Sequence, residues 1–254
     1  MSGSLSIVGL GPAGPETLTP EAAASLHRAH ALYGYGPYLD RIPVRADQAR
    51  YPSDNREEGT RARAALERAA AGANVALVSG GDPGVFAMAS VVCEQIDGGA
   101  ADWRNLDVVV VPGVTAMLAV AARAGAPLGH DFCAISLSDN LKPWAVVERR
   151  LDAAAFGGFV IALYNPISRS RPWQLGAALD RMRRHLPNST PTVFGRAVGR
   201  PGEQVTVTSL DQADPSIADM ATLIIVGSAF TRVVERPGMA PLVYTPRSLP
   251  ADST

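Results

Sequence analysis

The sequence has few of the residues that usually announce special chemistry. Only one of its 23 basic residues, Lys142, is a lysine, and its two cysteines, Cys93 and Cys133, lie in separate apolar segments. We interpret both cysteines as buried thiols of a protein from the reducing cytoplasm. No H-E-x-x-H motif or Cys/His cluster is present, so we expect no metal site. Gly-Lys-Ser/Thr and G-x-S-x-G strings are also missing, which removes support for a P-loop or a serine hydrolase.

Strong net charge and long apolar runs are lacking as well. The formal net charge of −1 argues against nucleic acid or an anionic membrane as the main partner. No apolar segment reaches membrane-spanning length, and the N-terminus lacks the regions of a signal peptide. With 47% hydrophobic and 19% charged residues, the 254-residue chain is expected to be a globular cytoplasmic protein.

The first half of the chain alternates β-rich apolar segments with helical patterns. We predict strands at Leu5–Gly9, Val75–Ser79 and Val108–Val111, and helices at Pro20–Ala31, Glu57–Ala71, Val85–Ile96 and Val114–Ala124. Thr19 and Pro20 provide an N-cap and a first helical residue, and Gly72 provides a stop. The strands are apolar without alternation, which is typical of a parallel sheet covered on both faces.

The second half continues the α/β pattern after a linker predicted at Gly125–His130. Gln204–Ser209 alternates Val and Thr, as an antiparallel or edge strand does, so a mixed sheet is expected. The segment from Arg236 contains four prolines and little periodicity. We therefore predict two α/β domains, 1–125 and 126–235, followed by an extended or disordered tail at 236–254.

The segment Ser6–Gly14, SIVGLGPAG, satisfies the dinucleotide-binding string G-x-G-x-x-G. In a dinucleotide fold the third glycine opens the helix that faces the pyrophosphate. Here Pro15 follows Gly14 and helical signals begin only at Thr19. A dinucleotide-binding oxidoreductase therefore stays open only as a weak alternative.

Three more Gly/Pro-rich loops follow apolar strands: VSGGDPGVF at 78–86, VVPGVTAM at 110–117 and ALYNPISRSR at 162–171. Loops at the carboxyl ends of strands line the ligand crevice in open α/β sheets. The four loops carry few charges, so we expect a ligand held largely by backbone amides and carbonyls.

Together these loops resemble those of the tetrapyrrole methylases, S-adenosylmethionine-dependent enzymes of corrin and sirohaem synthesis. Two stretches, GAPLGHDFCAISLSDNLKPW at 125–144 and LYNPISRSRPWQL at 163–175, are similar to the branch that methylates C17 of precorrin-3B. The resemblance implies ring contraction to precorrin-4 in cobalamin biosynthesis, with the same step on a cobalt-containing intermediate as the alternative. It also implies a homodimer of two-domain chains with S-adenosylmethionine in the cleft between the domains.

The resemblance further implies which residues contact the cofactor. They are the loop residues that match the family's motifs, namely Pro12, Gly81, Asp82, Val85, Phe86, Thr115, Ala116, Tyr164, Asn165, Ala197 and Val198. One departure is that Tyr35 stands where the uroporphyrinogen-methylating branch has an aspartate, its proposed base.

The implied substrate is a tetrapyrrole with acetate and propionate arms, which arginine forks suit. Candidates for these contacts are Arg169, Arg171, Arg196 and Arg232. Ser138 and Asp139, after the strand at 132–137, are candidates to deprotonate or orient a hydroxyl during ring contraction. Helix capping by either residue is the alternative.

Overall fold

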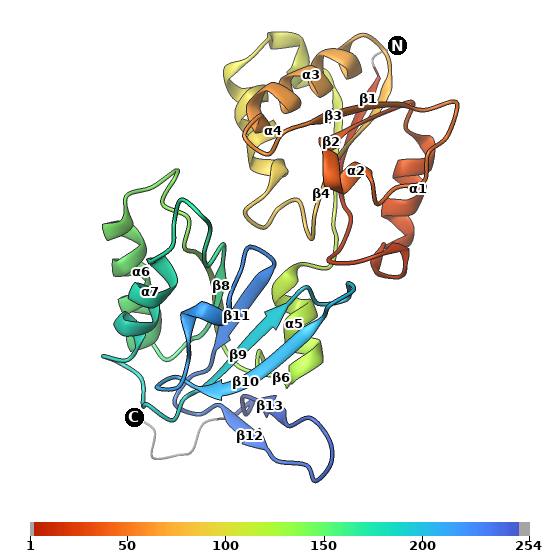
Figure 1. The fold of residues 1–254 in the computed structure, drawn as a ribbon. Coiled ribbons are helices and arrows are strands. Elements are labelled where there is room, and N and C mark those ends of the chain that lie inside the picture. Colours follow the sequence, from red (N-terminus) through yellow and green to blue (C-terminus); the bar gives the residue numbers. More distant parts are fainter. Residues whose placement is uncertain (1–2, 249–254) are drawn as a thin grey trace. The chain divides into compact units, whose positions relative to one another are not determined.

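The computed structural model describes residues 3–248 and divides into two compact units, Met1–Thr115 and Ala116–Thr254. The first unit is built on a five-stranded sheet (Figure 1). Across the sheet the strands are β3 (Ala49–Ser53), β2 (Ala31–Tyr35), β4 (Asn74–Ser79), β1 (Ser4–Gly9) and β5 (Asp107–Val111). Every neighbouring pair runs parallel, as predicted.

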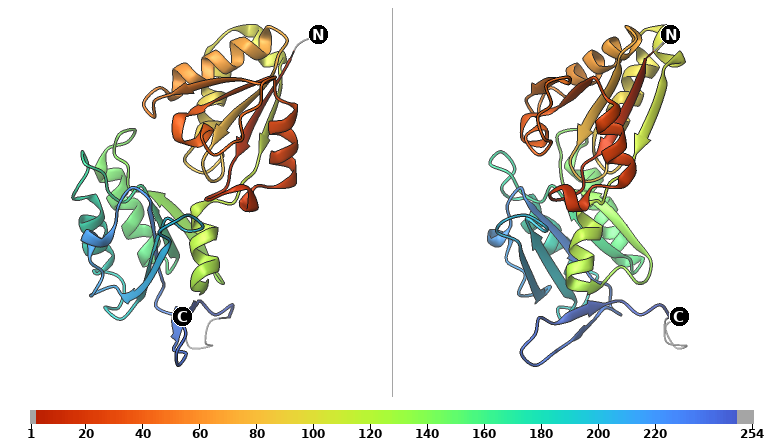
Figure 2. Two further views of the ribbon diagram at one scale, coloured as in Figure 1. Left: turned by 45° about the vertical axis from the view of Figure 1, so that its right-hand side comes forward. Right: turned by 90° about the vertical axis from the view of Figure 1, so that its right-hand side faces the viewer.

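Apolar side chains cover both faces of this sheet. Leu5 and Ile7 pack in one cluster with α3 (Glu58–Ala70) and α4 (Met88–Gly98). Val8 and Leu32 pack in a second cluster with α1 (Pro20–Arg28) and α2 (Gly36–Leu39). Successive side chains of a strand point to opposite faces, so α1 and α3 lie on opposite sides of the sheet (Figure 2).

Local signals placed α1 and α3 correctly. The Thr19 side chain accepts a hydrogen bond from the amide of Ala22, and Pro20 is the first residue of α1. Gly72 follows α3 with a φ of 95°, a value that favours glycine. The helix predicted up to Ala31 ends at Arg28, however, because β2 begins at Ala31. The sequence analysis predicted neither β2 nor β3.

The second unit contains a mixed sheet, also as predicted. Its strands, in order, are β10 (Gln204–Ser209), β9 (Pro191–Arg196), β11 (Thr222–Val226), β8 (Val160–Tyr164) and β7 (Phe132–Ser136). Only the pair β7–β8 is parallel among these described strands. Helices α6 (Trp144–Phe156) and α7 (Gln174–Met182) pack on this sheet in one large apolar cluster.

The division between the units falls after Thr115, earlier in the chain than the boundary predicted after residue 125. Helix α5 (Ala116–Ala124) accounts for the difference, because it packs on the second sheet. A Cβ on Gly195 of β9 would lie 2.3 Å from a methyl carbon of Val120, so α5 lies almost against that strand.

A small third sheet includes the first two residues of the predicted linker and three residues of the predicted tail. It joins β12 (Arg232–Val234), β13 (Leu242–Tyr244) and β6 (Gly125–Ala126). The Thr245 hydroxyl fixes the end of β13 by donating to the carbonyl of Pro127 at 2.6 Å. The rest of the predicted tail, 249–254, lies outside the described residues.

The two cysteines differ from the prediction that both are buried. Cys93 is exposed on α4, and Cys133 is half-buried in β7, where burial raises the pKa of its thiol. None of the helices within residues 3–248 is long and apolar enough to cross a membrane.

Candidate functional site

Three of the four predicted loops lie at one edge of the first sheet. They follow β1, β4 and β5, which are neighbours and run parallel. The carboxyl ends of parallel neighbours meet at the same edge. The loops at 10–19, 80–87 and 112–115 therefore converge, as predicted.

Glycines let these loops meet backbone to backbone. A Cβ on Gly113 would lie 2.2 Å from the Gly81 carbonyl oxygen, and one on Gly9 would lie 2.7 Å from the Gly113 amide nitrogen. Gly11 and Gly81 exchange two backbone hydrogen bonds of 3.1 and 3.0 Å. The point of convergence therefore has no room for side chains and offers a ligand a surface of peptide groups.

Asp82 ties the second loop to the third. Its Oδ1 accepts from the Gly84 amide at 2.7 Å, and its Oδ2 accepts from the Gly113 amide at 3.1 Å. Both carboxylate oxygens thus already have backbone donors. The structure gives Asp82 a role in shaping the loops, and a direct contact with the cofactor stays a prediction.

Arg41 holds the first loop and was missed by the sequence analysis. Its Nη2 donates to the carbonyl oxygens of Leu10 at 2.9 Å and Gly11 at 3.0 Å, and also to that of Ala13. One half-buried guanidinium thus binds three carbonyl oxygens of the first loop, residues 10–19. No local pattern pointed to Arg41, because about thirty residues separate it from its partners.

Three residues other than glycine have positive φ angles among the described residues, and each is a predicted cofactor contact. They are Phe86 with φ 52°, Asn165 with φ 52° and Ala197 with φ 49°. Such conformations cost about 1–3 kcal/mol each and persist where the surroundings impose them, often at ligand sites. The coincidence supports the predicted loops as binding elements in both units.

The predicted cofactor residues of the second unit lie on α5 and at the ends of two strands. Ala116 begins α5, and Thr115 precedes it as the last residue of the first unit.

The Tyr164 hydroxyl, at the end of β8, accepts from the amide of Met117 at 3.1 Å. Ala197 and Val198 follow β9 and are both buried. Asn165 donates from Nδ2 to the Ser136 hydroxyl at 3.0 Å.

The remaining cofactor candidates lie on the first and second loops. Pro12, Gly81 and Val85 are half-buried, and the Phe86 side chain is exposed.

The two predicted catalytic residues do not cap a helix. Helix α6 begins at Trp144, and its N-cap position is Pro143 without a side-chain cap. Asp139 Oδ2 instead accepts from Gln174 Nε2 at 3.1 Å, and the Ser138 carbonyl accepts from Lys142 Nζ at 2.9 Å. The capping alternative is therefore wrong, because too many residues separate Asp139 from the helix.

The four candidate substrate arginines do not form one group. Arg196 is committed to an ion pair with Asp219, Nε to Oδ2 at 2.8 Å. Arg232 is exposed on β12 of the small sheet, and Arg169 is exposed in the loop after β8. Only Arg171 is nearly buried, with 9% of its surface exposed, and its Nη1 donates to the Asn165 carbonyl at 3.1 Å.

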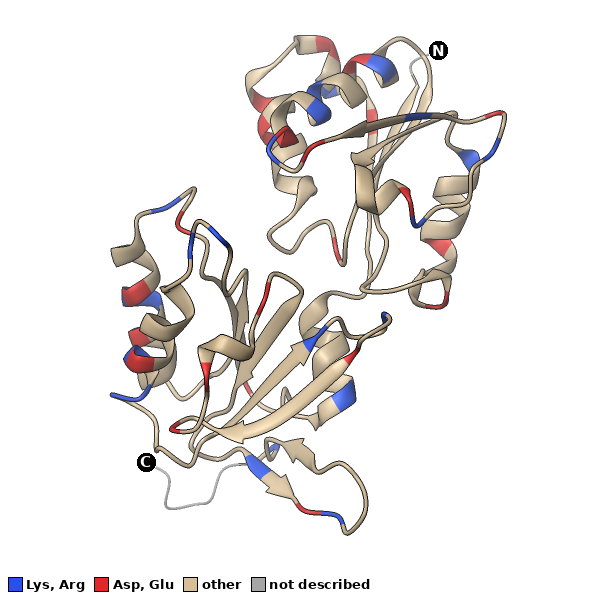
Figure 3. Ribbon diagram, in the orientation of Figure 1, with Lys and Arg blue, Asp and Glu red and all other residues tan. Residues whose placement is uncertain are grey.

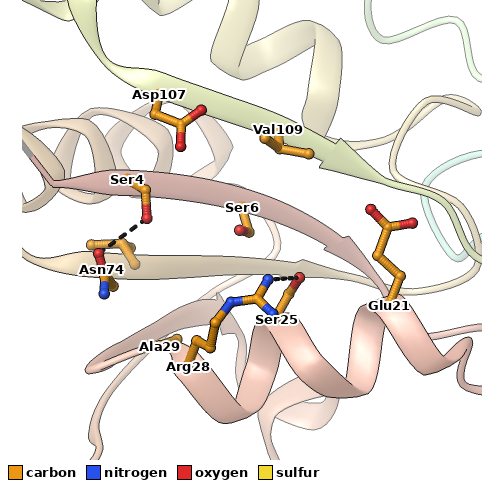
Figure 4. A pocket seen from close by; sticks show the side chains of 10 residues that line it. Ser4, Ser6, Glu21, Ser25, Arg28, Ala29, Asn74, Asp107 and Val109 are labelled. Carbon is orange, nitrogen blue, oxygen red and sulfur yellow. Dashed lines mark hydrogen bonds between the residues drawn. The ribbon is translucent and has the colours of Figure 1, made fainter.

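Other features of the molecule lie away from these loops. A pocket of about 270 Å³ is lined by residues from the starts of β1, β4 and β5 and from α1 (Figure 4). Ser4 and Asn74 are joined there by a 3.2 Å hydrogen bond. None of the predicted site residues lines this pocket. Within residues 3–248, no cluster of three or more His, Cys, Asp or Glu side chains is placed to hold a metal ion.

Comparison with known proteins places these loops in a family. Residues 4–214 match the tetrapyrrole (corrin/porphyrin) methylases. The chain belongs to this family. The match confirms the resemblance drawn from the loops, and it decides against the dinucleotide-binding oxidoreductase suggested by the G-x-G-x-x-G string.

Individual relatives narrow the comparison. The chain is 62% identical to a precorrin-3B C(17)-methyltransferase from a Sinorhizobium species, over 97% of both chains. It is 39% identical to a probable cobalt-factor III C(17)-methyltransferase from Salmonella typhimurium, over 95% of this chain and 99% of the other.

Solved structures agree in fold. The crystal structure of the methyltransferase CobJ matches with a TM-score of 0.92 and 47% identity, over 96% of this chain and all of that one. A Thermus thermophilus uroporphyrin-III C-methyltransferase in complex with S-adenosylhomocysteine matches with a TM-score of 0.66. At 23% identity, over 89% of this chain and 98% of the other, that likeness concerns the fold alone.

Proposed function

We propose that this chain is an S-adenosylmethionine-dependent methyltransferase that methylates precorrin-3B at C17 and contracts the macrocycle to give precorrin-4. The observation that carries the proposal is the 62% identity to a precorrin-3B C(17)-methyltransferase over almost the whole of both chains. The reaction belongs to cobalamin biosynthesis. A cobalamin biosynthesis protein from Mycobacterium bovis is 46% identical to this chain, which covers 49% of that protein's length.

The loops of the first unit fit the cofactor that this reaction needs. S-adenosylmethionine supplies an electrophilic methyl group on a sulfonium centre. The convergence of Gly9, Gly81 and Gly113 presents peptide groups rather than side chains, and peptide groups suit a zwitterionic ligand that carries no phosphate. Asp82 and Arg41 keep these loops in place. Methyl transfer is an in-line displacement, so the protein mainly positions the two reactants and excludes water.

The test is a reaction of the purified protein with precorrin-3B and methyl-labelled S-adenosylmethionine. We expect one labelled methyl group in the product by mass spectrometry, together with the absorption change of a contracted ring. A product without the label would contradict the proposal. So would the absence of a product from both precorrin-3B and the cobalt-containing intermediate.

A second candidate substrate is the cobalt-containing intermediate. It is favoured by the 39% identity to the Salmonella typhimurium protein over nearly the full length of both chains. A parallel reaction with cobalt-factor III distinguishes the two, since the leading proposal expects the higher kcat/KM with the metal-free precorrin.

We also propose that the enzyme works in the cytoplasm as a homodimer. The family resemblance supports the dimer, and the free thiols of Cys93 and Cys133 suit a reducing compartment. Light scattering after gel filtration tests the dimer, for which the expected mass is twice 26.6 kDa.

A further inference from the structure

The second unit contains the same short motif twice, a basic residue followed by proline and tryptophan. The two copies are Lys142-Pro143-Trp144 and Arg171-Pro172-Trp173. Each stands at the start of a helix, since α6 begins at Trp144 and α7 at Gln174. Pro143 is the N-cap residue of α6, and Pro172 directly precedes Trp173, the N-cap residue of α7. The two motifs thus place their basic residues in the loops that lead into α6 and α7, where Figure 3 shows positive charge.

The tryptophans bring the two motifs together. The ring centroids of Trp144 and Trp173 are 4.9 Å apart, and the rings meet edge to face at 77°. Trp144 packs against the apolar cluster of the unit, whereas half of the Trp173 surface is exposed. An exposed indole in edge-to-face contact with a second one offers an aromatic surface to a flat conjugated ligand.

The basic side chains of the two motifs form no ion pair with a carboxylate within residues 3–248. Lys142 Nζ donates to the Ser138 carbonyl at 2.9 Å, and Arg171 Nη1 donates to the Asn165 carbonyl at 3.1 Å. Asp139 interacts electrostatically with Lys142, but its Oδ2 accepts a hydrogen bond from Gln174. A nearly buried cation without a counter-ion is unfavourable. A carboxylate supplied by a ligand would relieve that cost.

The charges around Lys142 point the same way. Burial lowers the pKa of its ammonium group, and Arg150 of α6 and Arg171 lower it further, while Asp139 raises it. Positive charge is therefore in excess at this place, which favours an anion.

We propose that the two basic–Pro–Trp motifs bind the carboxylate-bearing edge of the tetrapyrrole, with one carboxylate arm on Lys142 and Arg171 and the macrocycle against Trp173. This inference rests on the proposed function and names the residues that select an acidic tetrapyrrole. It adds Lys142 and Trp173 to the binding residues and gives no such role to Arg196, which has its own carboxylate partner.

The experiment measures binding of uroporphyrin III, a stable porphyrin with acetate and propionate arms, by fluorescence titration. The variants are Lys142→Gln, Arg171→Gln, Arg171→Lys, Trp173→Leu and Trp173→Phe. Matched controls are Arg184→Gln, an exposed arginine whose side chain forms no hydrogen bond or ion pair within residues 3–248, and Phe156→Leu, an aromatic residue that is 84% exposed. S-adenosylhomocysteine affinity and binding of a tetracationic porphyrin are measured for each variant.

Lys142→Gln and Arg171→Gln should each weaken uroporphyrin III binding roughly ten- to a hundred-fold, as loss of a hydrogen bond to a charged group does. Arg171→Lys and Trp173→Phe should retain part of the affinity that Arg171→Gln and Trp173→Leu lose. The two controls should stay within about twofold of wild type, since exposed side chains contribute little. Lys142→Gln should leave S-adenosylhomocysteine affinity unchanged, and the cationic porphyrin should bind none of the proteins well.

The proposal is overturned if Arg184→Gln weakens uroporphyrin III binding as much as Lys142→Gln does, since any positive charge on the protein would then attract the porphyrin. Equal losses for S-adenosylhomocysteine and uroporphyrin III in Lys142→Gln would also overturn it, because they would indicate general damage to the unit. Wild-type methylation of precorrin-3B with an unchanged KM in both Gln variants overturns this site and leaves the proposed function standing. If uroporphyrin III binding depends on Lys142 and Arg171 but the protein methylates no precorrin, the binding site stands and the proposed function is overturned.

Discussion

Replacing Asp82 with alanine tests whether the loops of the first unit form the cofactor site. The substitution removes two hydrogen bonds from backbone amides to a carboxylate, one exposed (from Gly84) and one partly buried (from Gly113). Hydrogen bonds to charged groups contribute about 1.5–3 kcal/mol, and exposed ones contribute less. Assigning about 1.5 kcal/mol to the Gly113 bond and about 0.5 kcal/mol to the Gly84 bond gives a loss of about 2 kcal/mol in the free energy of unfolding.

The same change should weaken cofactor binding, because the third loop loses its tie to the second. If the cofactor must restore that arrangement at a cost of about 1.5 kcal/mol, its affinity falls about tenfold. Asp82→Asn keeps one acceptor oxygen and should show about half of each effect. Urea denaturation measures the first quantity, and calorimetry with S-adenosylhomocysteine measures the second. Glu94→Ala, at an exposed position of α4, is the control.

Two results would refute this reasoning. A lost affinity with unchanged stability would mean that the carboxylate contacts the cofactor directly and that its bond to Gly113 is unimportant. A lost stability with unchanged affinity would remove these loops from the cofactor site. Only a joint loss supports Asp82 as a residue that positions the loops.

Three further predictions follow from individual contacts. Gly113→Ala should lower the free energy of unfolding by about 1–3 kcal/mol, measured by urea denaturation, because the added Cβ would overlap the Gly81 carbonyl. Gly98→Ala, where the added Cβ meets open space, should leave the free energy of unfolding unchanged or raise it slightly. Arg41→Gln should lower the affinity for S-adenosylhomocysteine about tenfold, measured by calorimetry, because the first loop loses its side-chain support. Arg56→Gln, at an exposed position, should leave that affinity unchanged. An Arg41→Gln variant with wild-type affinity would show that the first loop does not need Arg41. Lys142→Met should raise the free energy of unfolding at pH 7, because burial lowers the pKa of Lys142 and the folded state therefore bears the cost of a charge. That gain should shrink as pH rises through the lowered pKa toward the ordinary value of 10.5, and a gain that grew with pH would contradict the reasoning.

The parts of the fold that the sequence predicted are those governed by local pattern. Uninterrupted apolar strands indicated the parallel sheet, and Thr19, Pro20 and Gly72 indicated where helices start and stop. The edge strand β3, ARYPS, has mostly exposed residues and a proline, so it carries no apolar signal. The strands of the small sheet are two or three residues long and depend on partners far away in the chain, so pattern could not reveal them.

The site divides in the same way. Gly/Pro-rich loops after strands could be read directly, and three of them meet as predicted. The side chains that hold those loops could not be read, because each acts on backbone far away in the sequence. Arg41 reaches back to Leu10 and Gly11, and Asp82 reaches forward to Gly113. Tertiary structure creates such contacts. Arg41 has no local signature that distinguishes it from other charged loop residues, and Asp82 was predicted from its motif as a cofactor contact and not as a residue that holds the loops.

Arg171 connects the two kinds of binding residue in the second unit. It donates to the carbonyl of Asn165, a predicted cofactor contact held at a positive φ, and it is also one of the two cations proposed to bind a carboxylate arm. A strained residue keeps its conformation only while its surroundings impose it. A carboxylate that draws on the Arg171 guanidinium therefore acts on the same backbone that the cofactor is predicted to contact. Because coupling between two ligands is reciprocal, the cofactor must change the affinity of the tetrapyrrole by the same factor as the tetrapyrrole changes the affinity of the cofactor. Arg171 is the residue through which we expect that coupling to pass, whereas Lys142, bonded to Ser138 and outside this contact, should affect the tetrapyrrole alone.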